Sequence, residues 1–327
     1  MEINDYIKNI FRIKNETDFN EYALKLYLYQ SEHNPIYKKY LKLIKHKTPI
    51  KTYQQIPFLP IEFFKTKNII TSGKTPKITF LSSGTTTSIR AKHLVVDINI
   101  YKKSILNCFK LFFGNIKKYT ILCLVPEFED NQNSSLAFMC QELIQKSNKK
   151  SSGFFIKRYE KLKNTIQELE RKKETYILFG LSMEILGFSK YCNIKLEYGT
   201  IIETGGNKRN TRKIIKEQLH QELKSNFNTQ NICSEYGMAE LLSQSYYLHR
   251  NNGFQSPPWK KILIRDKTNP FKIIQDGKRG YINIIDLANI YSCGFIATND
   301  LGYTTNSGFN ILGRAQNATE RGCNLMI

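Results

Sequence analysis

A run of small and hydroxylated residues near residue 85 is the part of this sequence best suited to hold an anion. It follows the apolar residues Phe80 and Leu81, and Gly84 within it lets main-chain N–H groups approach an anion closely. Hydroxyl groups that add hydrogen-bond donors belong to Ser82, Ser83, Thr85, Thr86 and Thr87. Basic side chains follow in Arg90, Lys92 and His93. The pattern predicts a strand that runs into a loop for nucleotide phosphates; a solvated Ser/Thr-rich turn is the alternative.

Later stretches have the composition of the rest of a nucleotide site. Gly205 and Gly206 follow a predicted strand, so their backbone can approach a flat ring closely. The stretch Ser-Glu-Tyr-Gly-Met-Ala-Glu contains a possible aromatic platform and a carboxylate, in Tyr236, Gly237 and Glu240. Further along, Asp300 provides a carboxylate in a predicted turn at a strand end. Arg314 provides a cation suited to ribose or phosphate oxygens. Each feature alone is more often structural, and only their joint occurrence in this order favours a site.

The charge balance of the 327-residue chain is strongly basic, with 49 Lys and Arg against 28 Asp and Glu and a formal net charge of +21. This charge would suit an acidic partner such as nucleic acid, an anionic membrane or an acidic carrier protein. The densest basic segment, residues 157–173, interleaves Glu160, Glu168 and Glu170, which is typical of a solvated helix face. We therefore do not expect nucleic-acid binding.

Cysteine usage argues against a zinc site or a disulfide framework, because the seven cysteines form no C-x-x-C pair and their number is odd. We expect most of them to be reduced and buried, whereas Cys323 lies in a polar tail. No apolar run typical of a secretory signal follows Met1, and the longest apolar runs are too short to span a bilayer. We expect a cytoplasmic protein without an integral membrane segment.

The hydrophobic pattern predicts a layered α/β fold with a largely parallel sheet. Helices are expected from Asp18, from Asn34-Pro35 and from Asp97, and the apolar residues 56–65 predict a buried but irregular segment. Buried-type strands are expected at residues 119–125, 175–179, 199–203 and 231–233, with helical or loop segments between them. From residue 260 the pattern changes to short strands. We expect an α/β core over residues 1–259 and a β-rich subdomain with the C-terminal tail over residues 260–327.

In their order, these motifs resemble the core motifs of adenylate-forming enzymes, which include acyl-CoA synthetases, luciferases and peptide-synthetase adenylation domains. The stretch Ile-Pro-Phe-Leu-Pro-Ile-Glu-Phe-Phe-Lys at 56–65, the loop with His93, and the tail Gly313-Arg314 to Glu-Arg-Gly-Cys-Asn-Leu at 320–325 are similar to the LuxE-type acyl-protein synthetases. That resemblance covers most of the chain and implies the layered fold of the adenylate-forming N-terminal domain. It also implies activation of a fatty acid with ATP and transfer of the acyl group to a cysteine near the C-terminus.

Roles for individual residues follow from the same resemblance. Thr85 and Thr86 would hold the ATP phosphates, Tyr236 would lie against adenine with Gly205 and Gly206, and Glu240 would help to bind Mg²⁺. Asp300 would take the ribose hydroxyls, Arg314 a ribose or phosphate oxygen, and Cys323 the acyl group. Arg321 beside this cysteine would favour its thiolate.

Departures from the family pattern leave alternatives open. Thr87, Ala239 and Asn299 stand where the superfamily has glycine, threonine and glycine, and the sequence ends without the usual C-terminal lid and its lysine. We expect Lys92, Arg90 or His93 to supply the missing cation, unless a separate protein completes the site. The predicted function is ATP-dependent activation of a carboxylic acid, fatty acid above all, with transfer to a thiol of Cys323, a carrier protein or coenzyme A. The rival prediction is a non-catalytic subunit of a lipid-synthesis or acyl-reductase complex.

Overall fold

The computed structural model describes residues 2–45, 49–83, 89–192, 194–205, 215–248 and 252–314. Five of its strands are parallel neighbours. They are β4 (Thr120–Leu124), β5 (Gly153–Phe154), β6 (Tyr176–Leu181), β7 (Gly199–Thr204) and β8 (Ile232–Tyr236). The central β4 and β6 have almost wholly apolar sequences, which suits strands covered on both faces. The strands expected at 119–125, 175–179, 199–203 and 231–233 are therefore confirmed.

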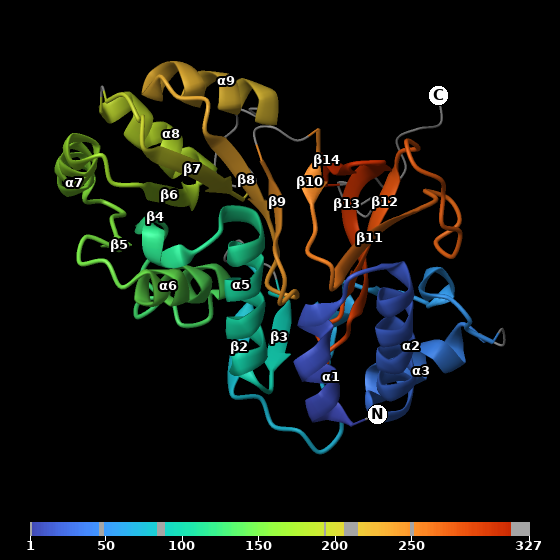
Figure 1. The fold of residues 1–327 in the computed structure, drawn as a ribbon. Coiled ribbons are helices and arrows are strands. Elements are labelled where there is room, and N and C mark those ends of the chain that lie inside the picture. Colours follow the sequence, from blue (N-terminus) through green and yellow to red (C-terminus); the bar gives the residue numbers. More distant parts are fainter. Residues whose placement is uncertain are drawn as a thin grey trace.

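Helices cover both faces of this parallel part (Figure 1). Successive side chains of a strand point to opposite faces, and in β4 Leu122 and Leu124 join one buried cluster while Ile121 and Cys123 join the other. The first cluster includes α7 (Tyr159–Lys172), α8 (Ser182–Tyr191) and α9 (Lys216–Phe227). The second includes α5 (Ile98–Phe113), capped by Asp97 as expected, and α6 (Ser135–Ser147). These layers confirm the α/β fold.

The β-rich part continues the same sheet with antiparallel strands. They are β9 (Ser245–Tyr247), β10 (Phe254–Gln255), β11 (Lys260–Arg265), β12 (Gly280–Asp286), β13 (Phe295–Thr305) and β14 (Gly308–Arg314). The sheet order is β11-β12-β13-β14-β10-β9-β8-β7-β6-β4-β5, and β1 (Leu59–Pro60) pairs with β13. Because β9 and β10 join the two parts in one sheet, a boundary between separate domains at residue 259 stays a prediction.

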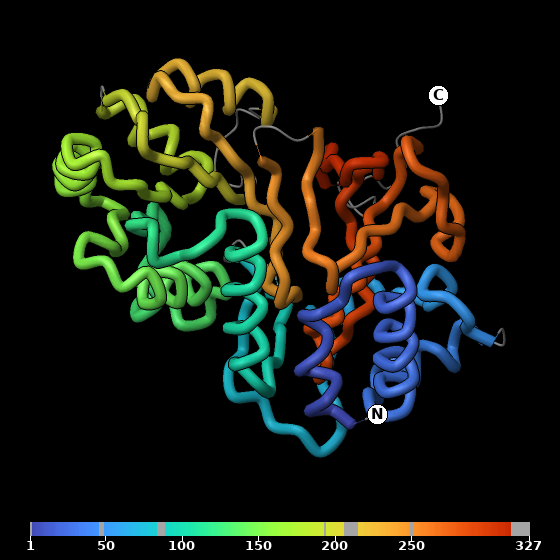
Figure 2. Tube along the Cα trace, viewed as in Figure 1, coloured from blue at the N-terminus to red at the C-terminus, as the bar shows by residue number. Residues whose placement is uncertain are grey.

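The N-terminal helices pack beside the antiparallel strands, where the tube trace shows blue segments against orange and red ones (Figure 2). They are α1 (Ile3–Asn9), η1 (Ile10–Arg12), α2 (Glu16–His33) and α3 (Pro35–Leu43), followed by η2 (Tyr53–Gln55) and α4 (Phe63–Thr66). Buried Gln30 on α2 donates through Nε2 to the carbonyls of Asn289 and Ile290, at 2.7 and 2.9 Å. Residues nearly 260 positions apart are thereby fixed side by side.

Two local expectations are wrong. Asn15, not Asp18, caps α2, because its side chain accepts from the Asp18 N–H at 2.8 Å while the Asp18 carboxylate accepts from the Lys14 N–H at 3.0 Å. The segment 56–65 is buried as expected but is not irregular, since it contains β1 and α4. The cap at Asn34 with Pro35 at the start of α3 is confirmed.

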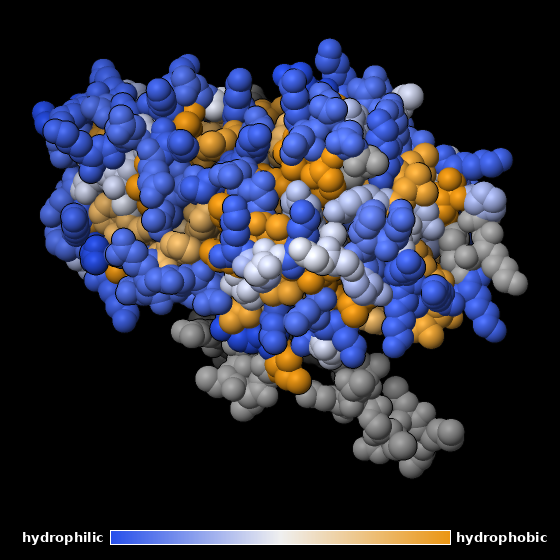
Figure 3. All heavy atoms as spheres, turned by 90° about the horizontal axis from the view of Figure 1, so that it is seen from below, coloured by the Kyte–Doolittle hydropathy of each residue, from blue (hydrophilic) through white to orange (hydrophobic). Residues whose placement is uncertain are grey.

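A two-stranded hairpin of β2 (Ile78–Leu81) and β3 (Lys92–Val95) stands apart from the large sheet and carries the predicted phosphate loop at its tip. A single turn, η3 (Ile116–Lys118), leads into β4. Among the described residues no helix is long and apolar enough to cross a membrane. The face seen from below is covered mainly by hydrophilic side chains, with hydrophobic ones gathered toward its middle (Figure 3).

Candidate active site

The carboxyl ends of β7 and β8 place the predicted ring platform beside the predicted glycine turn. These strands are parallel neighbours, with Thr204 opposite Glu235, so Gly205, which follows β7, comes next to Tyr236, the last residue of β8. Gly205 has φ +85°, a left-handed conformation that glycine adopts without strain. Ser182, at the start of α8, donates its hydroxyl hydrogen toward Glu203 and the Gly205 carbonyl, 2.5 and 2.8 Å away. Because Ser182 directly follows β6, the end of a third strand also holds the glycine turn.

Tyr236 also connects the parallel part with the antiparallel part of the sheet. Its hydroxyl donates to Oδ2 of Asp300 on β13 at 2.7 Å, and Nε of Arg314 on β14 donates to Oδ1 of Asp300 at 2.9 Å. Asp300 is 5% exposed, whereas the Arg314 side chain is 59% exposed and reaches solvent. Burial, followed by the charge and hydrogen bond of Asp300, raises the pKa of Tyr236, and the charge of Asp300 raises the pKa of Arg314 against the effect of burial. Residues from three motifs therefore meet at one place.

The base of the predicted phosphate loop is closed by hydrogen bonds between its two ends. The Ser82 N–H donates to the carbonyl of Ala91 at 3.0 Å, and the Ala91 N–H donates back to Oγ of Ser82 at 2.9 Å. Nε of Arg90 donates to the Ser82 carbonyl at 2.6 Å. Arg90, Lys92 and Ser83 are exposed there, so two positive charges flank the loop.

His93 links this hairpin to the segment that carries Glu240. Its Nδ1 lies 2.8 Å from the carbonyl oxygen of Ala239, so the nitrogen must carry the hydrogen and donate it. Burial lowers the pKa of His93 to about 4, although this hydrogen bond opposes the shift. The ring is therefore neutral at pH 7. The cationic role expected for His93 does not fit a neutral imidazole, and the same role for Lys92 or Arg90 stays a prediction.

Three further polar side chains at the strand ends were not predicted from the sequence. Glu235 is buried, accepts from the Thr204 hydroxyl, and has its pKa raised to about 7 by burial. The ammonium of Lys216 lies 3.2 and 4.2 Å from the ring centroids of Tyr247 and Phe254, and burial lowers its pKa to about 8. Ser182 follows β6 directly. A charged residue inside an apolar strand, as in Ile-Cys-Ser-Glu-Tyr, was the signal available for Glu235.

Several predicted site residues lie outside the described residues. They are Gly84, Thr85, Thr86, Thr87, Gly206 and Cys323, and their roles stay predictions. The six described cysteines are free and buried, as expected, and they are Cys108, Cys123, Cys140, Cys192, Cys233 and Cys293.

The layered α/β sheet, with its helices on both faces, has the fold of adenylate-forming enzymes, as comparison with solved structures shows. A 2-hydroxyisobutyryl-CoA ligase in complex with its acyl-AMP and CoA matches with a TM-score of 0.67 at 12% identity, over 91% of this chain and 69% of that one. ATP-bound MatB from Rhodopseudomonas palustris matches with a TM-score of 0.55 at 15% identity, over 72% and 47%. The amide bond synthetase McbA from Marinactinospora thermotolerans matches with a TM-score of 0.52 at 13% identity, over 73% and 49%.

The aligned regions therefore span about half the length of MatB and McbA. The sequence model of the acyl-protein synthetase family, LuxE, matches residues 11–327. The chain belongs to the LuxE acyl-protein synthetase family, which confirms the expected family resemblance. No curated protein matches it.

Proposed function

We propose that this chain activates a carboxylic acid with ATP and passes the acyl group to a thiol. In the first step a carboxylate oxygen of the acid attacks the α-phosphorus of ATP, and the bond to the leaving pyrophosphate breaks. In the second step a thiolate attacks the acyl carbonyl, and AMP leaves. Such chemistry needs little proton transfer but strong stabilisation of phosphate charge and accurate placement of the reactants.

The observation that carries the proposal is the cluster of Tyr236, Asp300 and Arg314 beside the glycine turn at Gly205. The Tyr236 ring next to a backbone without a side chain suits a flat base, and the Asp300 carboxylate suits two neighbouring ribose hydroxyls. The exposed Arg314, Arg90 and Lys92 suit phosphate oxygens. Tyr236, Asp300 and Arg314 come from β8, β13 and β14, so their cluster forms only in the folded chain. We propose that Arg90 and Lys92 of the hairpin complete the site. The acyl-AMP of the 2-hydroxyisobutyryl-CoA ligase structure and the ATP of the MatB structure are ligands of this kind.

Mg²⁺ fits this site with Glu240 as its protein ligand. Magnesium in phosphate-transfer sites is held by one or two carboxylates together with phosphate oxygens and water. Glu240 is 5% exposed, and the described part of the chain has no group of three or more His, Cys, Asp or Glu side chains that could hold a metal ion alone. A site in which Glu240 supplies one carboxylate and the nucleotide supplies phosphate oxygens matches this usual set of magnesium ligands. Bound there, Mg²⁺ would neutralise phosphate charge.

For the second step we propose Cys323 as the first acceptor, with an acyl carrier protein or coenzyme A as alternative acceptors. All six described cysteines are buried, and burial raises the pKa of Cys108 and Cys293 to about 12, which keeps them as unreactive thiols. The net charge of +21 would steer an acidic carrier toward the chain. We propose a fatty acid as the substrate and an acyl reductase as a further partner.

The proposal is tested by intact-mass spectrometry of the chain after incubation with ATP, Mg²⁺ and fatty acids of graded length. We expect an ATP-dependent acyl adduct that hydroxylamine removes. Cys323→Ala should abolish self-acylation, whereas Cys192→Ala, at a buried position, should keep it. If a carrier protein or coenzyme A is the acceptor, the adduct should appear there instead. No ATP-dependent adduct on the chain, a carrier or coenzyme A would refute the proposal.

A further inference from the structure

The segment 237–244 between β8 and β9, which carries Glu240, is held by buried side chains from distant parts of the chain. His93 donates to the carbonyl of Ala239 at 2.8 Å, and Nδ2 of Asn289 donates to the carbonyl of Glu240 at 2.8 Å. The Leu242 N–H donates to Oδ2 of Asp286 at 2.9 Å. Hydrogen bonds to backbone groups on both sides of Glu240 therefore fix the path of this segment.

A buried lysine supplies the next contact. Nζ of Lys260, on β11, donates to the carbonyl of Ser243 at 3.0 Å, and the Ser243 hydroxyl donates to Oδ1 of Asp286 at 2.7 Å. Ser243 thus bridges the ammonium and the carboxylate, which are 2% and 0% exposed. Burial lowers the pKa of Lys260 and raises that of Asp286, while each charge favours the ionised form of the other.

Lys260 also touches the ring platform. Its ammonium lies 5.4 Å from the centroid of the Tyr236 ring, within the range of a cation–π contact. One buried cation therefore supports both the ring that we assign to adenine and the segment that carries the proposed Mg²⁺ ligand. A buried charge is rarely kept in a protein interior even when it is paired, as Lys260 is with Asp286 through Ser243. A role beyond packing would explain why this one is present.

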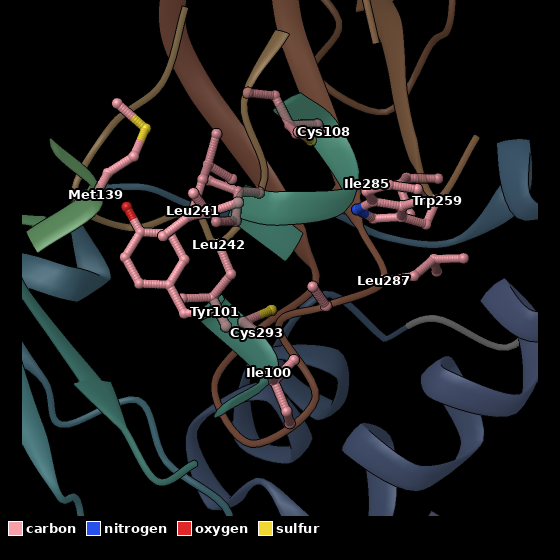
Figure 4. Packing of buried hydrophobic residues seen from close by; sticks show 14 of the residues in the cluster. Ile100, Tyr101, Cys108, Met139, Leu241, Leu242, Trp259, Ile285, Leu287 and Cys293 are labelled. Carbon is pink, nitrogen blue, oxygen red and sulfur yellow. The ribbon is translucent and has the colours of Figure 1, made fainter. Parts of the chain in front are cut away.

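The surrounding core leaves this segment little freedom (Figure 4). Leu241 and Leu242 lie in the same buried cluster as Tyr101, Cys108 and Trp259. The indole nitrogen of Trp259 donates to Oγ of Ser243 at 3.0 Å. Hydrogen bonds and apolar contacts thus hold the same few residues of the segment 237–244 in place.

We propose that Lys260 and Asp286 are positioning residues that hold Tyr236 and Glu240 in the arrangement that binds ATP with its metal. They do not touch the nucleotide themselves; they act through the Ser243 carbonyl, the Leu242 N–H and the Tyr236 ring. This inference rests on the proposed function, because Tyr236 and Glu240 are assigned to ATP there.

The test uses the double variant Lys260→Met/Asp286→Asn in the full chain. Removing both charges avoids the unpaired buried charge that a single substitution would leave, so the double variant is expected to fold. Its matched control is Lys102→Met/Glu142→Gln, which removes another ion pair, with 2.6 Å between Nζ and Oε1 and a buried Glu142. Hydrogen exchange of the backbone amides is measured over residues 237–247, and the Kd of Mg·ATP is measured by equilibrium dialysis. Exchange of pyrophosphate into ATP then gives KM and kcat.

We expect the amides of residues 237–247 to exchange about tenfold faster in the double variant, and Mg·ATP to bind about tenfold more weakly. The KM for ATP should rise by a similar factor while the KM for the acid stays unchanged, whereas simple loss of folded protein would lower only the apparent kcat. Unchanged amide exchange and Kd, or equal changes in the control, would overturn the inference. ATP binding without pyrophosphate exchange by the wild-type chain would refute the proposed function but not this inference.

Discussion

The hydroxyl of Tyr236 and the carboxylate of Asp300 lie 2.7 Å apart, although 64 positions separate them in the sequence. The contact joins the carboxyl end of a parallel strand to an antiparallel hairpin, and Arg314 completes it on the other carboxylate oxygen. Both carboxylate oxygens of Asp300 are thus oriented by neighbouring side chains. A prearranged acceptor of this kind is what two adjacent ribose hydroxyls require.

Replacing Asp300 with asparagine should therefore weaken ATP binding. The variant loses the negative charge that pairs with Arg314 and one hydrogen-bond acceptor, and charged hydrogen bonds contribute about 1.5–3 kcal/mol. We expect the Kd of ATP to rise by about tenfold or more. Tyr236→Phe keeps the ring and removes only the hydroxyl, so its Kd should rise by about fivefold at most. Equilibrium dialysis checks both, and an unchanged Kd for Asp300→Asn would contradict the assignment of ribose to this residue.

Lys92 provides a test of the cation expected beside the phosphate loop. It is exposed at the start of β3, at the end of the hairpin that carries the loop. Lys92→Met should lower kcat for pyrophosphate exchange by about tenfold or more, because a charge on the leaving group would lose its partner. Lys77 lies at the opposite end of the same hairpin, where its N–H donates to the Val95 carbonyl at 2.8 Å. Lys77→Met serves as the control, and equal losses in both variants would argue against a local role.

Substitution of Gly205 tests whether this glycine is needed for ligand contact or only to avoid backbone strain. Among the described residues a Cβ at this position would meet only the Leu181 side chain, at 3.6 Å, so Gly205→Ala should cost about 1–2 kcal/mol through its φ of +85°. Gly277 has a φ of +80° with open space around it, so Gly277→Ala should lose similar stability. Thermal unfolding should shift alike in the two variants. Only Gly205→Ala should bind ATP more weakly, and a similar loss in Gly277→Ala would show that strain alone is responsible.

The burial of His93 predicts a pH dependence of stability. Its folded pKa of about 4 lies below the ordinary value, so between these values the unfolded chain binds more protons. The free energy of unfolding should fall as the pH drops from about 6.5 toward 4, by up to about 3 kcal/mol from this group. His93→Asn keeps a donor for the Ala239 carbonyl but does not titrate. Denaturant unfolding at pH 7 and pH 5 should show a smaller decrease for this variant; an equal decrease would contradict the prediction.

Much of the site could be predicted because its residues occur in short motifs. Tyr236, Asp300 and Arg314 all occur in glycine-containing stretches whose order indicated their relation, and Tyr236 and Arg314 stand at strand ends. The turn expected at Asp300 is wrong, because this residue lies inside the long strand β13 and pairs with Arg314 of β14. The parallel strands could be predicted from continuous apolar runs. The sequence predicts the N-cap of α2 at Asp18, later than the actual cap Asn15, because both are good capping residues. Only the backbone conformation of the folded chain distinguishes them.

The burial of individual side chains could not be predicted from the sequence as well as the motifs and strands. Lys92 and His93 look alike as basic residues, but adjacent residues of a strand face opposite sides, so one is exposed and the other is buried. Lys260 in the stretch Lys-Lys-Ile-Leu-Ile-Arg resembles an exposed strand start. Its contact with Ser243 depends on how β11 packs against the segment 237–244, which no local pattern of residues contains.

Exchange of labelled pyrophosphate into ATP, measured with the purified full chain against fatty, aryl and short carboxylic acids, tests the central claim most directly. Exchange requires reversible formation of an acyl-adenylate and does not depend on which thiol accepts the acyl group. We expect exchange that one class of acid stimulates and that is lost without Mg²⁺. No exchange with any acid, in the presence of ATP and Mg²⁺, would contradict adenylation by this chain.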